Sequence, residues 1–477
     1  MLALRLAVNA AVWVPVHFDE AQYWAYGQEL AWGYFSKPPG VGAVIRLATE
    51  IGGDTMWMLR LPSALAHAVI AAVLFALGRR LFDAATGFWA ALAYTAAPGV
   101  SVSAMIMSTD PPMMAAWALA LLFWVRAAES GRLADWAAMG AAIGLGALAK
   151  YTMLALPAGA LGYALFSARG RDWRGAAVAA GVALAVLAPN LVWNAANGFA
   201  TVVHVAEDAD PGQGYGNPIK FAEFLGGQFG VIGPVLFVAI LVAAWRLGDW
   251  RGDWRMRLLA WSSLPLLAGM LVLAFATRAQ LNWAAPAYVA GTLFAVRWLL
   301  TIQARRWLRA QVAIGTLAAA AVYGLAAVYA ADGPSLARST DPFKKMRLAE
   351  PFCDRALAAM AEEGAETMLS LDRRRLSECM FLGGLGWDEI AVWAPLPAPQ
   401  NHHELVARLS PGDERRMLLV LYGQGDALPG AGTMPSAFRE ARLVDEGRFD
   451  THRDRHYSFA LWVVQGFEGY PDDDQKG

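Results

Sequence analysis

Two neighbouring carboxylates, Asp19 and Glu20, follow directly after the first apolar stretch of the chain, with Lys37 and Arg60 further along. A carboxylate at the end of a membrane span can act as a general base when it is shielded from water. Cations beside it can bind a departing phosphate and neutralise its charge. These four residues therefore predict transfer of a group from a lipid phosphate to a hydroxyl. The structural alternatives for the acid pair are a solvated span end or a helix N-terminus stabilised by the helix dipole, and the alternative for Lys37 is an interfacial anchor.

Further polar residues interrupt otherwise apolar sequence and are candidates for substrate binding. They are Tyr34, Asp110, Lys150, His204, Arg278, Asn282 and Trp283. An ionisable residue inside an apolar hairpin, such as Lys150, is a functional candidate. Asp110 stands in Ser108-Thr109-Asp110-Pro111-Pro112, where capping of the next helix explains it equally well. His204 lies between residues 193 and 227, which are expected to form a long glycine-rich loop. Such loops are often lids or binding loops, and plain disorder is the alternative.

The elements that must position these residues are membrane spans. The chain has 477 residues, of which 57% are apolar and 17% charged. Residues 1–330 contain 38 charged residues and residues 331–477 contain 41, so the first part is membrane-like and the second resembles a water-soluble domain. Eleven stretches are long and apolar enough, or nearly so, to span a membrane: 2–16, 61–79, 84–104, 111–126, 134–150, 152–168, 175–193, 228–246, 258–276, 281–298 and 310–330.

The distribution of Lys and Arg predicts the orientation of these spans. With the N-terminus in the cytoplasm, the cytoplasmic segments hold 16 Lys and Arg and the outer segments hold six. Such an excess marks the cytoplasmic side. Eleven crossings then place the C-terminal domain outside the cytoplasm, together with all the candidate residues named above.

The C-terminal domain alternates short apolar runs with polar helical stretches, which predicts a small α/β layer. Expected strands are 367–371, 390–393, 417–422 and 456–464, and expected helices are 374–382 and 403–409. Asp332-Gly333-Pro334 marks the linker before it. Both cysteines, Cys353 and Cys379, fall in this domain, where an oxidising compartment would permit a disulfide; two unpaired core thiols are the alternative.

Other signals in the sequence are weak. His402-His403 and His452-x3-His456 have no accompanying metal-ligand pattern, so solvated surface is the better interpretation. Gly140-x3-Gly144 indicates helix packing. A net charge of −1 and the absence of a phosphate loop or dinucleotide fingerprint in the sequence argue against nucleic acid and nucleotide-sugar partners.

Three runs at the start of the chain resemble the glycosyltransferase family 39-like membrane enzymes, which include protein O-mannosyltransferases and the aminoarabinose transferase that modifies lipid A. These runs are 18–24 (FDEAQYW), 33–39 (GYFSKPP) and 60–63 (RLPS). The segments 108–110, 146–150 and 278–286 also resemble that family, in the same order. The resemblance covers about residues 12–290, and no motif of the C-terminal domain takes part in it.

The resemblance implies a GT-C membrane fold. Together with the hydropathy and charge pattern, it predicts about eleven transmembrane helices, a catalytic part over 1–330 and a soluble periplasmic α/β domain over 331–477. It implies that Asp19 is the catalytic acid/base, that Glu20 is the second acid of the pair, and that Lys37 and Arg60 lie at the donor phosphate. We expect Arg278, which could hydrogen-bond a phosphate, to contribute to the same binding. Ser36 stands where the aminoarabinose enzymes often have Glu, which argues against an aminoarabinose donor.

The resulting hypothesis is an inverting glycosyltransferase of the bacterial inner membrane. Its donor would be a polyprenyl-phosphate-linked sugar, and its acceptor a hydroxyl of lipid A, another glycolipid, a polysaccharide or a protein. The sequence requires no cofactor, and two adjacent acids are too few to predict a divalent metal site. The alternative is a transporter or flippase of a lipid-linked sugar, although transporters place their sites near the midplane of the membrane rather than at span ends.

Overall fold

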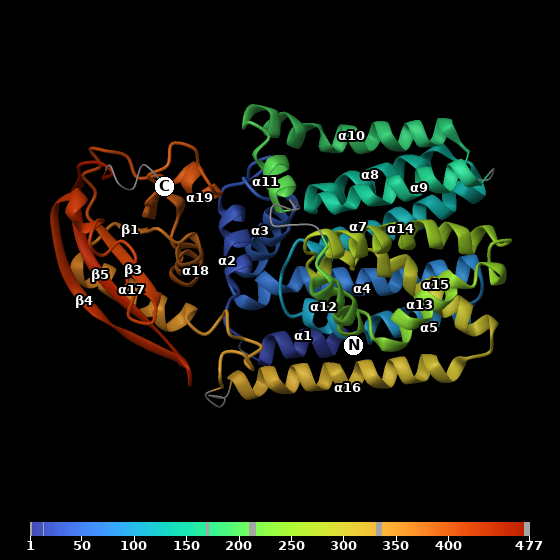
Figure 1. Ribbon diagram of the computed structural model, residues 1–477. Helices are drawn as coiled ribbons and strands as arrows, with labels where there is room; N and C mark the ends of the chain where they lie inside the picture. Colours follow the sequence, from blue (N-terminus) through green and yellow to red (C-terminus); the bar gives the residue numbers. More distant parts are fainter. Residues whose placement is uncertain (1, 13, 168–170, 209–215, 331–335, 472–477) are drawn as a thin grey trace. The chain divides into compact units, whose positions relative to one another are not determined.

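The computed structural model describes residues 2–12, 14–167, 171–208, 216–330 and 336–471 (Figure 1). Its contacts divide the chain into two compact units. The helical unit comprises residues 1–12, 32–44 and 60–326, and the sheet unit comprises residues 13–31, 45–59 and 327–477. The expected linker at 332–334 lies outside the described residues.

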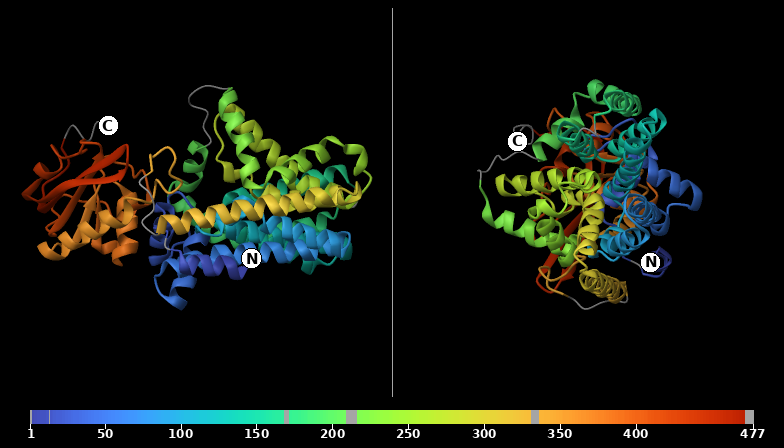
Figure 2. Two further views of the ribbon diagram at one scale, coloured as in Figure 1. Left: turned by 90° about the horizontal axis from the view of Figure 1, so that it is seen from below. Right: turned by 90° about the vertical axis from the view of Figure 1, so that its right-hand side faces the viewer.

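The helical unit is built from apolar helices that run side by side, and most are seen along their axes in the right-hand view of Figure 2. The first helices of the chain that contribute to it are α1 (Leu2–Ala11), α3 (Gly40–Gly52), α4 (Met56–Leu81), α5 (Ala84–Thr95), α6 (Pro98–Ser103), α7 (Asp110–Ser130), α8 (Leu133–Ala149) and α9 (Ala155–Phe166). The others are α10 (Trp173–Ala196), α11 (Ala200–Asp208), α12 (Pro218–Val231), α13 (Pro234–Trp245), α14 (Trp254–Ala276), α15 (Ala287–Thr301) and α16 (Arg305–Ala330).

Local sequence explains where several of these helices begin and end. Asp83, Asp172 and Asn217 accept hydrogen bonds from the backbone of the first turns of α5, α10 and α12. Gly131 ends α7 in the left-handed conformation. The expectation of a long loop over 193–227 is wrong, because α11 and the start of α12 occupy much of it.

Helix packing in this unit depends on small residues. α8 packs on both α7 and α10. A Cβ atom at Gly140 would lie 2.2 Å from the carbonyl oxygen of Ala179, and one at Gly144 would lie 2.6 Å from Cβ of Val186. The glycines therefore permit the close approach of α8 and α10, as the Gly140-x3-Gly144 pattern predicts.

All eleven predicted spans fall on helical segments, but the count of eleven crossings is not confirmed. Five helices of the described residues are long and apolar enough to cross a membrane: α4, α7, α10, α14 and α16. The chain bends by 116° between α12 and α13, and a sixth span arises if this pair counts as one. The predicted span at 228–246 is therefore wrong in its start, because the chain breaks at Ile232-Gly233, where Gly233 has φ +94°. Further apolar helices, α1, α8, α15 and Tyr151–Phe166, have 10–17 residues.

The sheet unit has five strands in the order β2-β1-β3-β5-β4. They are β1 (Thr367–Ser370), β2 (Ile390–Val392), β3 (Met417–Gln424), β4 (Phe438–His452) and β5 (Arg455–Phe467). β2, β1 and β3 are parallel, and β4 and β5 form an antiparallel hairpin. The helices of this unit are α2 (Phe18–Gln28), α17 (Ala349–Glu363), α18 (Arg373–Gly383) and α19 (His402–Val406).

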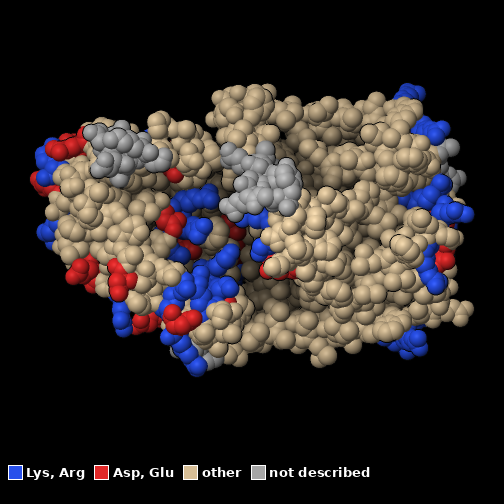
Figure 3. Space-filling model, viewed as in Figure 1, with Lys and Arg blue, Asp and Glu red and all other residues tan. Residues whose placement is uncertain are grey.

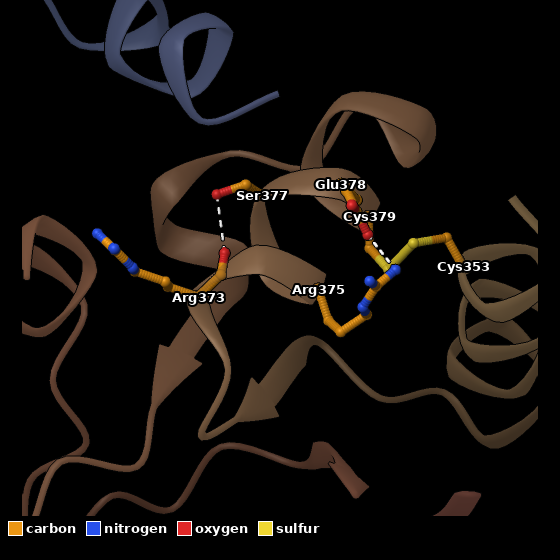
Figure 4. The surroundings of a disulfide bond; sticks show 6 residues. All are labelled: Cys353, Arg373, Arg375, Ser377, Glu378 and Cys379. Carbon is orange, nitrogen blue, oxygen red and sulfur yellow. Dashed lines mark hydrogen bonds and ion pairs between the residues drawn. A yellow bond between two sulfur atoms is a disulfide. The ribbon is translucent and has the colours of Figure 1, made fainter. Parts of the chain in front are cut away.

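Four strands and two helices of the sheet unit match the predicted segments, whereas β4 and α17 were not predicted. β4 is mostly exposed and rich in charge, so it lacks the apolar alternation that marks a half-buried strand. A disulfide joins Cys353 of α17 to Cys379 of α18 (Figure 4). Beside it, Arg375 forms an ion pair with Glu378 within α18.

α2 packs against α18 rather than presenting its aromatic side chains to lipid. Trp24 contacts the ring of Phe381 edge-on at 5.4 Å and donates a hydrogen bond from Nε1 to Asp54 at 2.6 Å. Tyr26 contacts His402 edge-on. Both aromatic side chains are therefore buried within the sheet unit.

Candidate active site

Three residues that the sequence singles out meet in the helical unit. Nζ of Lys150 lies 2.7 Å from Oδ1 of Asp110, and Nδ2 of Asn282 donates to Oδ2 of Asp110 at 2.7 Å. Asp110 is 6% exposed. Both oxygens of this buried carboxylate are thus occupied, so Asp110 holds the ammonium and the amide in place rather than acting as a free base.

The three residues come from three different helix ends. Asp110 begins α7 after Thr109, Lys150 follows the last residue of α8, and Asn282 lies in the short 3-10 helix Leu281–Ala284. Pro111 and Pro112 suit the first turn of α7, where the backbone has no N–H partner within the helix. The helix dipole favours a carboxylate at this position. An ammonium has three N–H donors, so Lys150 can bind a further acceptor while it holds Asp110.

The other ends of the same helices gather basic residues. Arg80 of α4 pairs with Glu129 of α7, Arg126 of α7 with Asp135 of α8, and Arg297 of α15 with Asp83. Figure 3 shows Lys and Arg at one end of the helical unit, with few charges along its sides. Arg126 follows Asp110 by 16 residues in α7, so it lies about 24 Å from Asp110 along the helix.

The loop that contains Lys37 is fixed against α8 and α10. Tyr34 and Lys37 exchange backbone hydrogen bonds in a tight turn. A Cβ atom at Gly40 would lie 2.7 Å from the carbonyl oxygen of Leu148, next to the end of α8, and one at Gly33 would overlap the ring of Trp193. The loop therefore lies beside the α8 end that leads into Lys150, and Lys37 is half-buried there.

Two asparagines of α10, which sequence reasoning missed, support this loop. Nδ2 of Asn190 donates to the carbonyl oxygen of Trp32 at 2.6 Å, and the hydroxyl of Tyr151 donates to Oδ1 of Asn190 at 2.6 Å. Asn194 donates to Tyr151, and both asparagines are buried. Thr201 donates to the carbonyl oxygen of Tyr34. Asn190 and Asn194 are spaced by one helical turn, which is the only trace that sequence reasoning could have used.

The remaining candidates of the helical unit are placed as follows. The ring of His204 in α11 lies 6.0 Å from that of Phe35 in the Lys37 loop. Arg60 in α4 is buried, whereas Arg278 is exposed and Trp283 is half-buried in the segment that holds Asn282. The structure therefore brings Tyr34, Lys37, Lys150, Asp110, Asn282 and His204 to helix ends and loops that contact one another.

Asp19 and Glu20 belong to the sheet unit and start α2. Oε2 of Glu20 accepts a hydrogen bond from the backbone N–H of His17 at 3.0 Å, and Nδ1 of His17 accepts one from the backbone of Asp19. Glu20 is fully buried and completes a capping box, which is the structural alternative noted for it. The side chain of Asp19 is 42% exposed, so it is accessible to a reacting hydroxyl.

The histidines of the sheet unit correct one expectation. His402 and His403 are buried rather than solvated, and burial lowers the pKa of His402 to about 4 and that of His403 to about 3. Nε2 of His403 lies 2.9 Å from Oγ of Ser377, and Trp387 packs on both rings. His452 is also buried, and its Nε2 lies 3.2 Å from Asp341. Among the described residues no group of three or more His, Cys, Asp or Glu is placed to hold a metal ion.

Comparison with known proteins agrees with this architecture. Residues 36–193 match the family described as dolichyl-phosphate-mannose-protein mannosyltransferase. The chain is 37% identical over 287 residues to the lipid A galacturonosyltransferase RgtD of Rhizobium johnstonii, covering 60% of each chain. It is 30% identical over 203 residues to the undecaprenyl phosphate-alpha-4-amino-4-deoxy-L-arabinose arabinosyl transferase of Pseudomonas aeruginosa, covering 39% of this chain and 36% of that one.

Among solved structures, the chain resembles ArnT from Cupriavidus metallidurans bound to undecaprenyl phosphate, with a TM-score of 0.64, 15% identity and 96% of both chains covered. This likeness concerns the fold. The matched part of the Rhizobium relative is less than two thirds of its length. The resemblance found in the sequence is confirmed: residues 36–193 match the mannosyltransferase family, and 96% of the chain shares the fold of ArnT from Cupriavidus metallidurans.

Proposed function

We propose that this multi-pass membrane protein is an inverting glycosyltransferase that moves a sugar from a polyprenyl phosphate to a hydroxyl of a lipid A-type glycolipid. The observation that supports this best is the meeting of Lys150, Asp110 and Asn282 beside the Lys37 loop, at the helix ends opposite the arginines. A cation and an amide that are held by one buried carboxylate are preorganised to bind a phosphate or a sugar hydroxyl.

The proposed reaction is a single displacement. Asp19 removes the proton of the acceptor hydroxyl, the oxygen attacks the anomeric carbon, and the bond from that carbon to the phosphate oxygen breaks. The polyprenyl phosphate leaves with the bonding electron pair. We assign Lys37, Arg60 and Arg278 to that phosphate, and Asp110, Lys150, Asn282 and Trp283 to the donor headgroup.

For the donor we propose a hexuronic acid rather than an amino sugar. The relative with 37% identity is named for galacturonosyl transfer to lipid A, and the more distant one for transfer of an aminoarabinose. Ser36 next to Lys37 provides no carboxylate for an amino group. The carboxylate of a uronic acid would instead be stabilised by the cations of this region.

For the location we propose the bacterial inner membrane, with the N-terminus in the cytoplasm. The arginine-rich helix ends then face the cytoplasm, and Lys150 and the Lys37 loop face the periplasm. The disulfide of the sheet unit suits an oxidising compartment.

The test is a transfer assay in membranes with a panel of polyprenyl-phosphate sugars and lipid A, read by mass spectrometry. We expect one donor to be consumed, with the acceptor gaining one sugar. Asp19→Asn and Lys37→Ala should lose activity while inserting normally. Lys220→Ala, which changes an exposed lysine that pairs with Glu223, is the matched control and should stay active. Full transfer by Asp19→Asn would contradict the proposed base.

A further inference from the structure

A basic cavity of about 240 Å³ opens in the sheet unit. Five cations line it: Arg338, Lys344, Lys345, Arg374 and Arg375. No Asp or Glu lines it within the described part of the chain. Figure 3 shows a patch of Lys and Arg on this unit. A cavity with this lining attracts anions.

The cations are brought together by two segments. Arg338, Lys344 and Lys345 come from the residues that precede α17, and Arg374 and Arg375 from the first turn of α18. The positive end of the α18 dipole therefore adds to the same field. Tyr457 of β5 and Thr451 of β4 add hydroxyls to the lining.

The positive charge of the cavity is poorly balanced. Lys344, Lys345 and Arg374 form no ion pair with any acid that the structure describes. The nearby acids have partners of their own: Glu378 pairs with Arg375, Asp372 accepts from the hydroxyl of Tyr422, and Asp454 accepts from the backbone of Arg338.

One buried donor in the cavity wall lacks a partner. Arg375 is 8% exposed, and its Nε makes no hydrogen bond, although Nη1 pairs with Glu378. A buried guanidinium N–H without an acceptor is costly, so an anion in the cavity would remove this cost. Arg375, the cluster of unpaired cations and the helix dipole thus point independently to a negatively charged ligand.

We propose that this cavity binds a phosphate monoester on the headgroup of the glycolipid acceptor. A phosphate dianion matches several converging ammonium and guanidinium groups better than a single carboxylate does. The guanidinium of Arg374 lies over the ring of Phe18 at 5.1 Å, and Phe18 precedes Asp19 in α2. Binding here would hold the acceptor beside the proposed base. The inference rests on the proposed function, since it identifies the acceptor as phosphorylated.

The test measures binding of the full chain in nanodiscs to diphosphoryl lipid A and to the same lipid without its phosphates. Lys344→Ala/Lys345→Ala should raise the Kd of the phosphorylated lipid about tenfold and leave that of the dephosphorylated lipid unchanged. Arg442→Ala/Arg448→Ala removes the same charge from exposed positions of β4 outside the cavity and should change neither Kd. In transfer assays the lysine variant should raise KM for the phosphorylated acceptor with kcat retained.

Equal binding of both lipids, or an equal loss in the β4 control, would overturn the cavity assignment. If inorganic phosphate displaced the lipid at a concentration equal to that of the lipid, the cavity would be a site for free phosphate. This result would also overturn the proposal. A failure of the proposed function looks different: no donor would be consumed, yet the lysine variant would still lose affinity for the phosphorylated lipid.

Discussion

Asp110 holds both Lys150 and Asn282 in the helical unit. We predict that Lys150→Met destabilises the protein by roughly 3 kcal/mol, since it leaves a buried carboxylate with one partner removed. Transfer activity should fall at least about 100-fold. Thermal unfolding in detergent and the transfer assay measure the two effects, with Lys220→Met as the control.

The double variant Asp110→Asn/Lys150→Met separates the charge from the packing. It should recover part of the stability that Lys150→Met loses, because the buried charge is gone, while activity stays low. Additive losses of stability would show that the two residues do not interact as the structure has them.

His403 gives the sheet unit a dependence on pH. Its pKa is lowered by burial to about 3, whereas an unfolded chain has a histidine pKa of about 6.5. The unfolded state therefore binds more protons below that value, so this contribution to stability is present above pH 6.5 and is lost as the pH falls. The unfolding temperature of the native protein should drop between pH 7.5 and pH 5, and in His403→Gln it should drop less. An identical pH profile in the variant would contradict this cause.

At the scale of single residues, the sequence singled out the three residues that meet in the helical unit. Lys150, Asp110 and Asn282 stood out because charge and amides are rare in apolar sequence. Asn190 and Asn194 did not, since an asparagine in a helix has no pattern that reveals its distant partner, here Trp32. The burial of His402 and His403 was also missed, because it depends on Trp387 and α2 packing over them.

Among the elements, the loop that holds Lys37 depends on a close approach that only glycine permits. Gly40→Ala should push this loop away from the carbonyl of Leu148 and shift Lys37. We expect transfer activity to fall about tenfold or more with insertion unchanged. Gly181→Ala is the matched control, because a Cβ atom there meets nothing within 4 Å. Equal activity of the two variants would show that the loop tolerates the shift.

The elements also show where sequence patterns stop being informative. Long apolar stretches located the helical segments, and short apolar runs located four strands. The break between α12 and α13 and the short length of several apolar helices were not visible, because hydropathy averages over a window and does not register a bend. The strand β4 was not predicted because it is rich in charged residues and has few apolar residues that could mark it as a strand.

For the whole molecule, the disulfide and the arginine-rich helix ends predict the same orientation. Cys353 and Cys379 are paired, so a single introduced cysteine would be the labelled one. A membrane-impermeant maleimide should label Asp426→Cys in the sheet unit of spheroplasts and should not label Gly248→Cys, which lies among the arginines after α13. Labelling of Gly248→Cys alone would reverse the topology.

Reduction provides a second test on this scale. The disulfide closes a loop with a sequence separation of 26 residues, and a loop of this size contributes about 3 kcal/mol by restricting the unfolded chain. A reductant should lower the unfolding temperature of the native protein and leave that of Cys353→Ser/Cys379→Ser unchanged.

The division of the chain at residue 330 stays a prediction, which limited proteolysis between 330 and 336 would test.

The strand β4 lies at one edge of the sheet and is largely exposed, with Arg439, Glu440, Arg442, Glu446 and Arg448 among its side chains. A long open edge can recruit a strand from a neighbouring molecule and start aggregation, and charges of both signs along it oppose that pairing. Proteins confined to a membrane meet each other repeatedly in two dimensions. The charged side chains of β4, which left this strand unpredicted, would thus oppose pairing between neighbouring copies of this domain. Replacing those charges with Thr and Val would favour clustering without disturbing the fold of a single copy.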